Sequence, residues 1–199
     1  RTQSDVLIVG AGAGRDLLSA LVFDQSSIVG VEINANILHV VHDVFGDFSG
    51  HLDQHPKITL VNDEARSYVA RSPDFYDIIQ ISLIDSWAAT AAGAFVLTEH
   101  SLYTMEAWKI FLEHLKPNGI LTLTCYYYPP MPGSAYRLVS LAVAALEEQG
   151  VQNPRRHIAM VRAPSTAGSP LTHVTILVAK DPFSRQDLSL LENKVVSLK

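Results

Sequence analysis

The chain has 199 residues, a formal net charge of −5, 48% hydrophobic residues and a single cysteine, Cys125. This length predicts one domain, residues 1–199, with a substantial core. The charge gives no general attraction for nucleic acid, and one cysteine excludes an internal disulfide and a cysteine-cluster metal site. No apolar run reaches the roughly 20 residues that a membrane span needs, and no signal peptide is visible. We therefore expect a cytoplasmic domain, and its start at Arg1, just before the first expected strand, indicates a fragment of a longer chain.

The first expected strand runs directly into a glycine-rich turn. Aliphatic residues from Asp5 to Val9 end in Gly10, Gly12 and Gly14, and apolar residues at helical spacing follow. This pattern predicts a buried parallel strand, a tight turn and a helix whose N-terminus faces a nucleotide-type ligand. The dinucleotide fingerprint places its third glycine at the sixth position, where this chain has Arg15. We expect that side chain to obstruct close helix–strand packing, which disfavours NAD. The alternative is a turn with a structural role and no ligand.

Further strands and helices alternate along the chain. The remaining strands are expected at 28–33, 58–61, 76–82, 120–124, 157–162 and 173–179. Helices are expected at 34–45, 101–115 and 135–148, together with a short helix that reaches Arg71 and a short last helix after 181. Residues 46–57, 83–100 and 125–133 are expected to be connecting segments. This order predicts an α/β fold: a doubly wound, Rossmann-like parallel sheet of about seven strands, with one antiparallel strand near the end and helices on both faces. Its ligand should lie at the carboxyl ends of the strands.

Acidic residues follow the second and third expected strands. Glu32 stands 20 residues after Gly12, where a carboxylate accepts both hydroxyls of a ribose; a solvated strand end is the alternative. Asn62, Asp63 and Glu64 come after the third strand, where a carboxylate can accept an adenine amino group. A helix N-cap at Asn62 or Asp63 is the competing interpretation.

These motifs resemble the class I S-adenosylmethionine-dependent methyltransferases, and within them the spermidine synthase (polyamine aminopropyltransferase) family. The resemblance runs from Asp5 to about Thr124. It includes the glycine turn, the acid Glu32, the sequence NDEAR at 62–66, and FYDII at 75–79 followed by Asp85. The segments LTE at 97–99 and LKPNGIL at 115–121 are similar to those around the following helix. The resemblance implies S-adenosylmethionine or its decarboxylated form as cosubstrate.

The chain departs from the aminopropyltransferase pattern after the fourth strand. That family has two aspartates separated by two small residues and followed by a proline. In this chain Ser82 stands at the position of the first aspartate and Asp85 at that of the second, and no proline follows Asp85. The family's N-terminal β-domain is also absent from this chain. The pattern looks more like the spermidine synthase-like domains attached to bacterial multi-pass membrane proteins.

A carboxylate near an amine nucleophile can hold its cation and accept its proton. Asp85 is the catalytic candidate, with Glu99 and His100 in second place; capping of a short helix is the alternative for Asp85. Trp87, Tyr103 and Tyr126 are candidates to wall the pocket and favour a cation, although each could simply pack in the core.

The histidines have spacings that a helix could turn toward one metal ion. They occur as His39 with His42 and as His51 with His55, on a polar helix face and the segment after it. A solvated surface is the favoured interpretation, and we expect no metal.

The leading hypothesis is a transferase that moves an aminopropyl or methyl group from an S-adenosyl compound to a small-molecule amine, without a nucleic-acid partner. The second is a catalytically degenerate transferase fold that senses a ligand for an attached membrane domain, which Ser82 favours. An NAD-dependent oxidoreductase is third. Homodimerisation is compatible with each.

Overall fold

The computed structural model describes residues 2–84, 101–164 and 170–197. Its strands are β1 (Asp5–Val9), β2 (Ser27–Glu32), β3 (Ile58–Asn62), β4 (Tyr76–Ser82), β5 (Leu115–Tyr127), β6 (Ile158–Arg162) and β7 (Thr172–Ala179). Its α-helices are α1 (Arg15–Val22), α2 (Ala35–His39), α3 (Gly46–Ser49), α4 (Ala65–Arg71), α7 (Met105–Glu113), α8 (Gly133–Glu148) and α9 (Arg185–Ser197). Short π- or 3₁₀-helical turns are η1 (Val40–Val44), η2 (Leu52–Gln54) and η3 (Pro154–His157).

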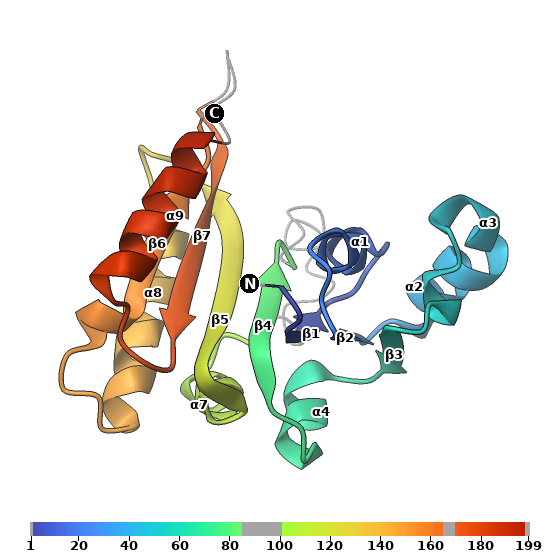
Figure 1. Cartoon of the computed structure of the whole chain (residues 1–199), viewed down its shortest axis with the longest axis horizontal. Helices are drawn as coiled ribbons and strands as arrows, with labels where there is room; N and C mark the ends of the chain where they lie inside the picture. The colour runs from blue at the N-terminus through green and yellow to red at the C-terminus, as the bar shows by residue number, and fades with distance from the viewer. Residues whose placement is uncertain (1, 85–100, 165–169, 198–199) are drawn as a thin grey trace.

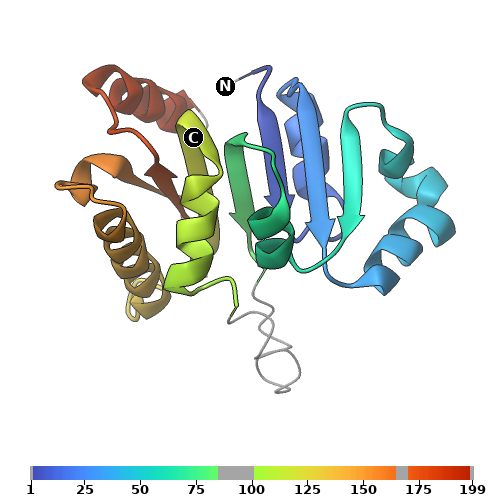
Figure 2. The same cartoon turned by 90° about the horizontal axis from the view of Figure 1, so that it is seen from below.

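The seven strands form one sheet in the order β3-β2-β1-β4-β5-β7-β6. The first five pair in parallel, and β7 runs antiparallel to both β5 and β6. Figure 2 shows β1 to β4 side by side, with helices on both sides of the sheet. The predicted Rossmann-like sheet with one antiparallel strand near its end is confirmed. Because the chain order reverses between β1 and β4, a ligand crevice is expected at their carboxyl ends.

Helices on the two faces of the sheet bury separate apolar cores. The larger core joins α4, α7 and α8 to the sheet, and the fully buried Trp108 and Phe111 of α7 lie in it. The smaller core packs Leu17 and Ala20 of α1 against Val6 and Ile8 of β1. Successive β1 residues thus face opposite cores, which explains why this strand reads as continuously aliphatic.

The α1–sheet contact corrects the expectation for Arg15. Its side chain is 67% exposed and its Nε lies 3.2 Å from Asp16 Oδ1, so it does not enter the helix–strand contact. Close approach is provided instead by Gly30 of β2, where an added Cβ would lie 3.0 Å from Leu17 Cδ2 and 3.2 Å from Ala11 Cβ. The glycine that lets helix and strand approach therefore lies on the neighbouring strand.

Strand β5 and helix α9 are longer than expected. β5 continues to Tyr127, so Cys125 to Tyr127 belong to the strand and pair with β7. The last helix, α9, has 13 residues rather than a short turn, and none of them is buried. Among the described residues, no helix combines the length and apolarity needed to cross a bilayer.

Residues 35–54 form an excursion rather than one sheet-packed helix. The expected helix over 34–45 ends as α2 at His39 and continues as the π-turn η1, while the expected linker contains α3 and η2. Its apolar residues Val44, Phe45 and Phe48 are exposed, Phe48 to 91%. Figure 1 shows α2 and α3 at the edge of the molecule beyond β3. The helical spacing of the apolar residues at 37–45 correctly predicted helical backbone, but it did not predict that Val44 and Phe45 would be exposed.

Candidate functional site

The glycine turn follows β1 and has left-handed backbone at three positions. Gly10, Gly12 and Gly14 have φ values of 74°, 51° and 88°, which L side chains rarely adopt. A Cβ on Gly10 would also lie 2.8 Å from Ile84 Cγ2. The N–H of Gly10 donates to Val31 O at 2.9 Å, so the turn is fixed against β2. The turn therefore brings bare backbone to the carboxyl end of β2.

Glu32 ends β2 and is held by that turn. Gly12 N–H donates to Glu32 Oε2 at 2.9 Å and Asn34 N–H donates to Oε1 at 3.0 Å. The residue is only 6% exposed. A carboxylate has about four lone-pair positions, so two remain for further donors. Two adjacent hydroxyls of a ribose fit that capacity.

The three successive polar residues at the end of β3, 62–64, have three different roles. Asn62 Nδ2 donates to the carbonyls of Glu32 and Ile33, at 2.8 and 3.1 Å, and so joins the ends of β2 and β3. Asp63 pairs with Arg71 and accepts the Glu64 N–H at 2.8 Å. The amide of Asp63 donates to Glu32 O at 3.1 Å. Asn62 thus orients the strand ends, while Asp63 is oriented by α4.

Glu64, and not Asn62 or Asp63, caps α4. Its carboxylate accepts from the N–H groups of Arg66 and Ser67, at 3.0 and 2.9 Å, and from Ser67 Oγ at 2.7 Å. Partial burial acts to raise the pKa of Glu64, but the Ser67 and Arg66 hydrogen bonds outweigh it and hold this pKa below its ordinary value. The expected cap at one of the two preceding residues is wrong, because the helix begins at Ala65.

Gly10, Glu32, Asp63 and Glu64 border a cavity of about 250 Å³ at the carboxyl ends of β1 and β2, whereas Asn62 does not line it. Glu32, Asn34, Asp63 and Glu64 provide its polar lining. Its apolar lining comes from Val9, Val31, Ile33, Ile37, Ala65, Ile84 and Leu102. A mostly apolar slot with a few carboxylates suits a flat heterocycle joined to a sugar. The sequence did not predict Ile37, Ile84 and Leu102 as site residues, because apolar residues in helices and connecting segments are also typical of a hydrophobic core.

A second hollow, of about 370 Å³, opens on the other side of the glycine turn. It is lined by residues 10–13, by Arg15 and Asp16, and by Ser82, Leu83 and Tyr126. Ser82 ends β4, and its hydroxyl accepts a hydrogen bond from Gln80 Nε2 at 3.1 Å. Tyr126 lies tilted against the His173 ring, with ring centres 5.1 Å apart. Gly10 lines both hollows, so one elongated ligand can occupy the two.

Of the remaining expected site residues, Tyr103 is the one that lies within the described ranges. Tyr103 packs against the larger core cluster. Asp85, Trp87, Glu99 and His100 lie outside the described residues, so their expected roles stay predictions.

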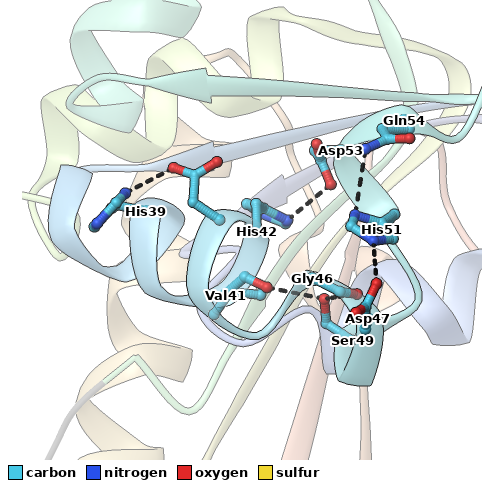
Figure 3. Close-up of polar contacts among 10 residues, drawn as sticks. His39, Val41, His42, Gly46, Asp47, Ser49, His51, Asp53 and Gln54 are labelled. Carbon is cyan, nitrogen blue, oxygen red and sulfur yellow. Dashed lines mark hydrogen bonds and ion pairs between the residues drawn. The ribbon is translucent and has the colours of Figure 1, made fainter.

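The histidines of the excursion each stand beside an aspartate (Figure 3). His39 Nδ1 lies 2.7 Å from Asp43, His51 Nε2 lies 2.9 Å from Asp47, and His42 Nδ1 lies 3.3 Å from Asp53. Within the described ranges, no three or more potential ligand side chains gather around a point that could hold a metal ion. The histidine contacts therefore connect successive turns of the excursion.

Comparison with known proteins agrees with this geometry. The family model described as "Spermine/spermidine synthase domain" matches residues 1–125. "Polyamine aminopropyltransferase 2" of Pseudomonas aeruginosa is 27% identical over 123 residues, which are 60% of this chain and 32% of that protein. "Polyamine aminopropyltransferase" of Corynebacterium efficiens is 25% identical over 142 residues, 70% of this chain and 26% of the relative. The chain thus spans about a third or less of these curated relatives.

A solved spermidine synthase in complex with the transition-state analogue AdoDATO has the same fold. It superposes with a TM-score of 0.65 at 19% identity and covers 93% of this chain and 58% of its own. Sheet order, glycine turn and strand-end acid define a Rossmann-like fold of the class I methyltransferase type. Within that class, the chain belongs to the spermine/spermidine synthase domain family.

Proposed function

We propose that this domain binds an S-adenosyl compound and transfers an aminopropyl or methyl group from its sulfonium to a small amine. One observation carries the proposal: Glu32, buried and oriented by Gly12 and Asn34, borders a nucleoside-sized cavity at the topological switch of the sheet. Glu32 would accept the two ribose hydroxyls. Asp63, at the end of β3, would accept the adenine amino group between apolar walls.

The sulfonium end of such a ligand would cross Gly10 into the second hollow. No covalent help is needed at a sulfonium, because its substituent carbon is already activated and the protein mainly positions the two partners. The amine must lose its proton for attack, and a carboxylate within hydrogen-bond reach supplies the base. Asp85 remains our candidate for that base, and Tyr126 is placed to wall the hollow.

Calorimetry with S-adenosylmethionine, its decarboxylated form and methylthioadenosine tests the proposal. We expect at least one of the three to bind with 1:1 stoichiometry. Absence of binding to all three would refute it. Incubation with putrescine or another amine then identifies the transferred group: consumption of S-adenosylmethionine indicates methyl transfer, and consumption of its decarboxylated form indicates aminopropyl transfer.

A second candidate function is a ligand-sensing domain without turnover. Ser82 favours it, because this hydroxyl stands at the end of β4 where the family resemblance expects the first of two aspartates, and it is bonded to Gln80. Binding of a donor without turnover across a panel of polyamines would support it. An Asp85→Asn variant that keeps any activity found in the wild type would remove Asp85 from the catalytic role.

A further inference from the structure

A separate cavity of about 460 Å³ lies at the far end of the sheet, where η3 leads into β6. Arg155 and Arg156 of η3 and Arg185 of α9 line it, together with the apolar Ile158, Phe183 and Leu188. β6 is four strands away from β1 in the sheet order, a lateral separation of about 19 Å at about 4.8 Å per strand. This cavity is therefore distinct from the two hollows at the glycine turn.

The cavity concentrates positive charge without internal compensation. Within the described ranges, Arg155, Arg156 and Arg185 form no ion pair and no side-chain hydrogen bond. The chain has 20 acidic residues against 15 basic ones, so carboxylates are not scarce. Three uncompensated guanidinium groups on one cavity mark a place that attracts an anion.

Two carboxylates that neighbour the cavity residues in the sequence, Asp181 and Asp187, are directed to other groups. Asp181 Oδ2 accepts the N–H of Asn118 at 2.6 Å. Asp187 Oδ2 accepts from Ser184 N and Oγ, at 2.9 and 2.6 Å, and Ser184 Oγ accepts the Asp187 N–H in return. This reciprocal pair fixes the start of α9, whose N-terminal dipole adds positive potential at Arg185.

The backbone under the arginines is fixed while their head groups stay free. Phe183 N–H donates to Arg156 O at 2.8 Å, which joins the segment before α9 to η3. The buried His157 places Nδ1 3.0 Å from Ala179 O and so joins η3 to the end of β7. The anchored backbone lowers the ordering cost of binding, and the free guanidinium groups keep their donors available for a ligand.

We propose that this cavity binds a small phosphorylated ligand with an apolar or aromatic body, of the nucleoside diphosphate class. Guanidinium forks match phosphate oxygens in geometry, and a diphosphate carries enough negative charge to engage three arginines. Ile158, Phe183 and Leu188 form the apolar wall for the rest of the ligand. The volume falls within the range of about 300–1,000 Å³ that is usual for small-molecule sites.

Calorimetry with UDP and with pyrophosphate, in phosphate-free buffer at low salt, tests the proposal. UDP lacks adenine, which keeps this result separate from binding at the proposed donor cavity. We expect both probes to bind, UDP more tightly, and the double variant Arg155→Gln/Arg185→Gln to lose at least about tenfold in affinity. Arg137→Gln, which removes an exposed arginine of α8 away from the cavity, should bind as the wild type does.

Three outcomes would overturn the proposal: no binding of either probe at millimolar concentration, equal affinity in the double variant, or binding to anionic phosphatidylserine vesicles but to neither probe. The arginines are exposed, so circular dichroism should show a native fold in each variant. As a second measurement, UDP should shift the backbone amide resonances of residues 155–158 and 183–188. Shifts confined to other residues would also contradict it.

Discussion

Glu32 and Gly30 of β2 show two kinds of constraint on single residues. Glu32 is constrained by its polar contacts, since two backbone amides fix its carboxylate beside the cavity. Gly30 is constrained by space alone: a Cβ there would lie 2.9 Å from Leu60 Cδ2 and 3.0 Å from Leu17 Cδ2. The close seating of α1, whose N-terminus borders the glycine turn, therefore depends on a missing side chain.

Gly30→Ala should lower the free energy of unfolding by about 1–3 kcal/mol, the usual cost of overpacking a core. Urea unfolding followed by circular dichroism measures it. Gly133→Ala is the matched control, because a Cβ on Gly133 meets nothing within 4 Å and the residue begins α8. A Gly30→Ala protein as stable as the control would show that α1 and β2 do not need this close approach.

Among the helices, α4 depends on one charged N-cap residue, Glu64. Glu64 accepts two of the free N–H groups of the first turn, and its lowered pKa reports that the folded state favours the ionised carboxylate. A depressed carboxyl pKa stabilises the fold above the ordinary value near 4.5, and this contribution disappears as the pH falls. The α4 cap is therefore a pH-dependent contact.

Glu64→Ala should cost about 1 kcal/mol of stability at pH 7. The difference from the wild type should shrink as the pH falls below 4.5, because the wild-type carboxylate becomes protonated. Asn34→Ala is the control: Asn34 caps α2 with a neutral amide, so its loss should not vary with pH. Chemical denaturation at several pH values checks this, and a pH-independent loss for Glu64→Ala would contradict it.

The secondary structure near the site shows what the sequence could and could not predict. Glu32 of the cavity's polar lining could be predicted, because the second expected strand ends in an acid about 20 residues after the glycines. The roles of Asp63 and Glu64 were not, since three successive polar residues leave the first helical residue undetermined. Likewise, Val44 and Phe45 follow a helical pattern yet remain exposed, because periodicity does not reveal whether a partner surface is present. Asp85 lies outside the described residues, so its catalytic role stays a prediction.

For the whole molecule, Lys116 joins three strands at the edge opposite the donor cavity. Its Nζ contacts the carboxylates of Asp5 in β1 and Asp77 in β4, the latter at 3.0 Å, while Lys116 itself lies in β5. The hydrogen bond to Asp5, opposed by slight desolvation and aided by Asp77, raises the pKa of Lys116. Its stabilising contribution is present at neutral pH and is lost only as the pH rises through this raised pKa.

Lys116→Met should reduce stability by about 1 kcal/mol at neutral pH, because Asp5 and Asp77 then lose their shared cation. The loss should be smaller in 1 M salt, where charge interactions are screened to about 3 Å. Lys109→Met, on the exposed side of α7, is the control and should change stability little. Thermal unfolding at two salt concentrations checks both; an equal effect of the two variants would contradict the role of Lys116.

The most direct test of the account is whether Glu32 recognises ribose hydroxyls. Calorimetry would compare methylthioadenosine with its 2′,3′-dideoxy analogue on the wild type and on Glu32→Gln, with Glu148→Gln as a charge-matched control at the end of α8. We predict that the missing hydroxyls weaken wild-type and Glu148→Gln binding by about tenfold or more, since each charge-assisted hydrogen bond contributes about 1.5–3 kcal/mol. Glu32→Gln should bind both ligands weakly and with nearly equal affinity. If Glu32→Gln binds methylthioadenosine as tightly as the wild type, or still discriminates fully between the two ligands, the assignment of the donor cavity is wrong.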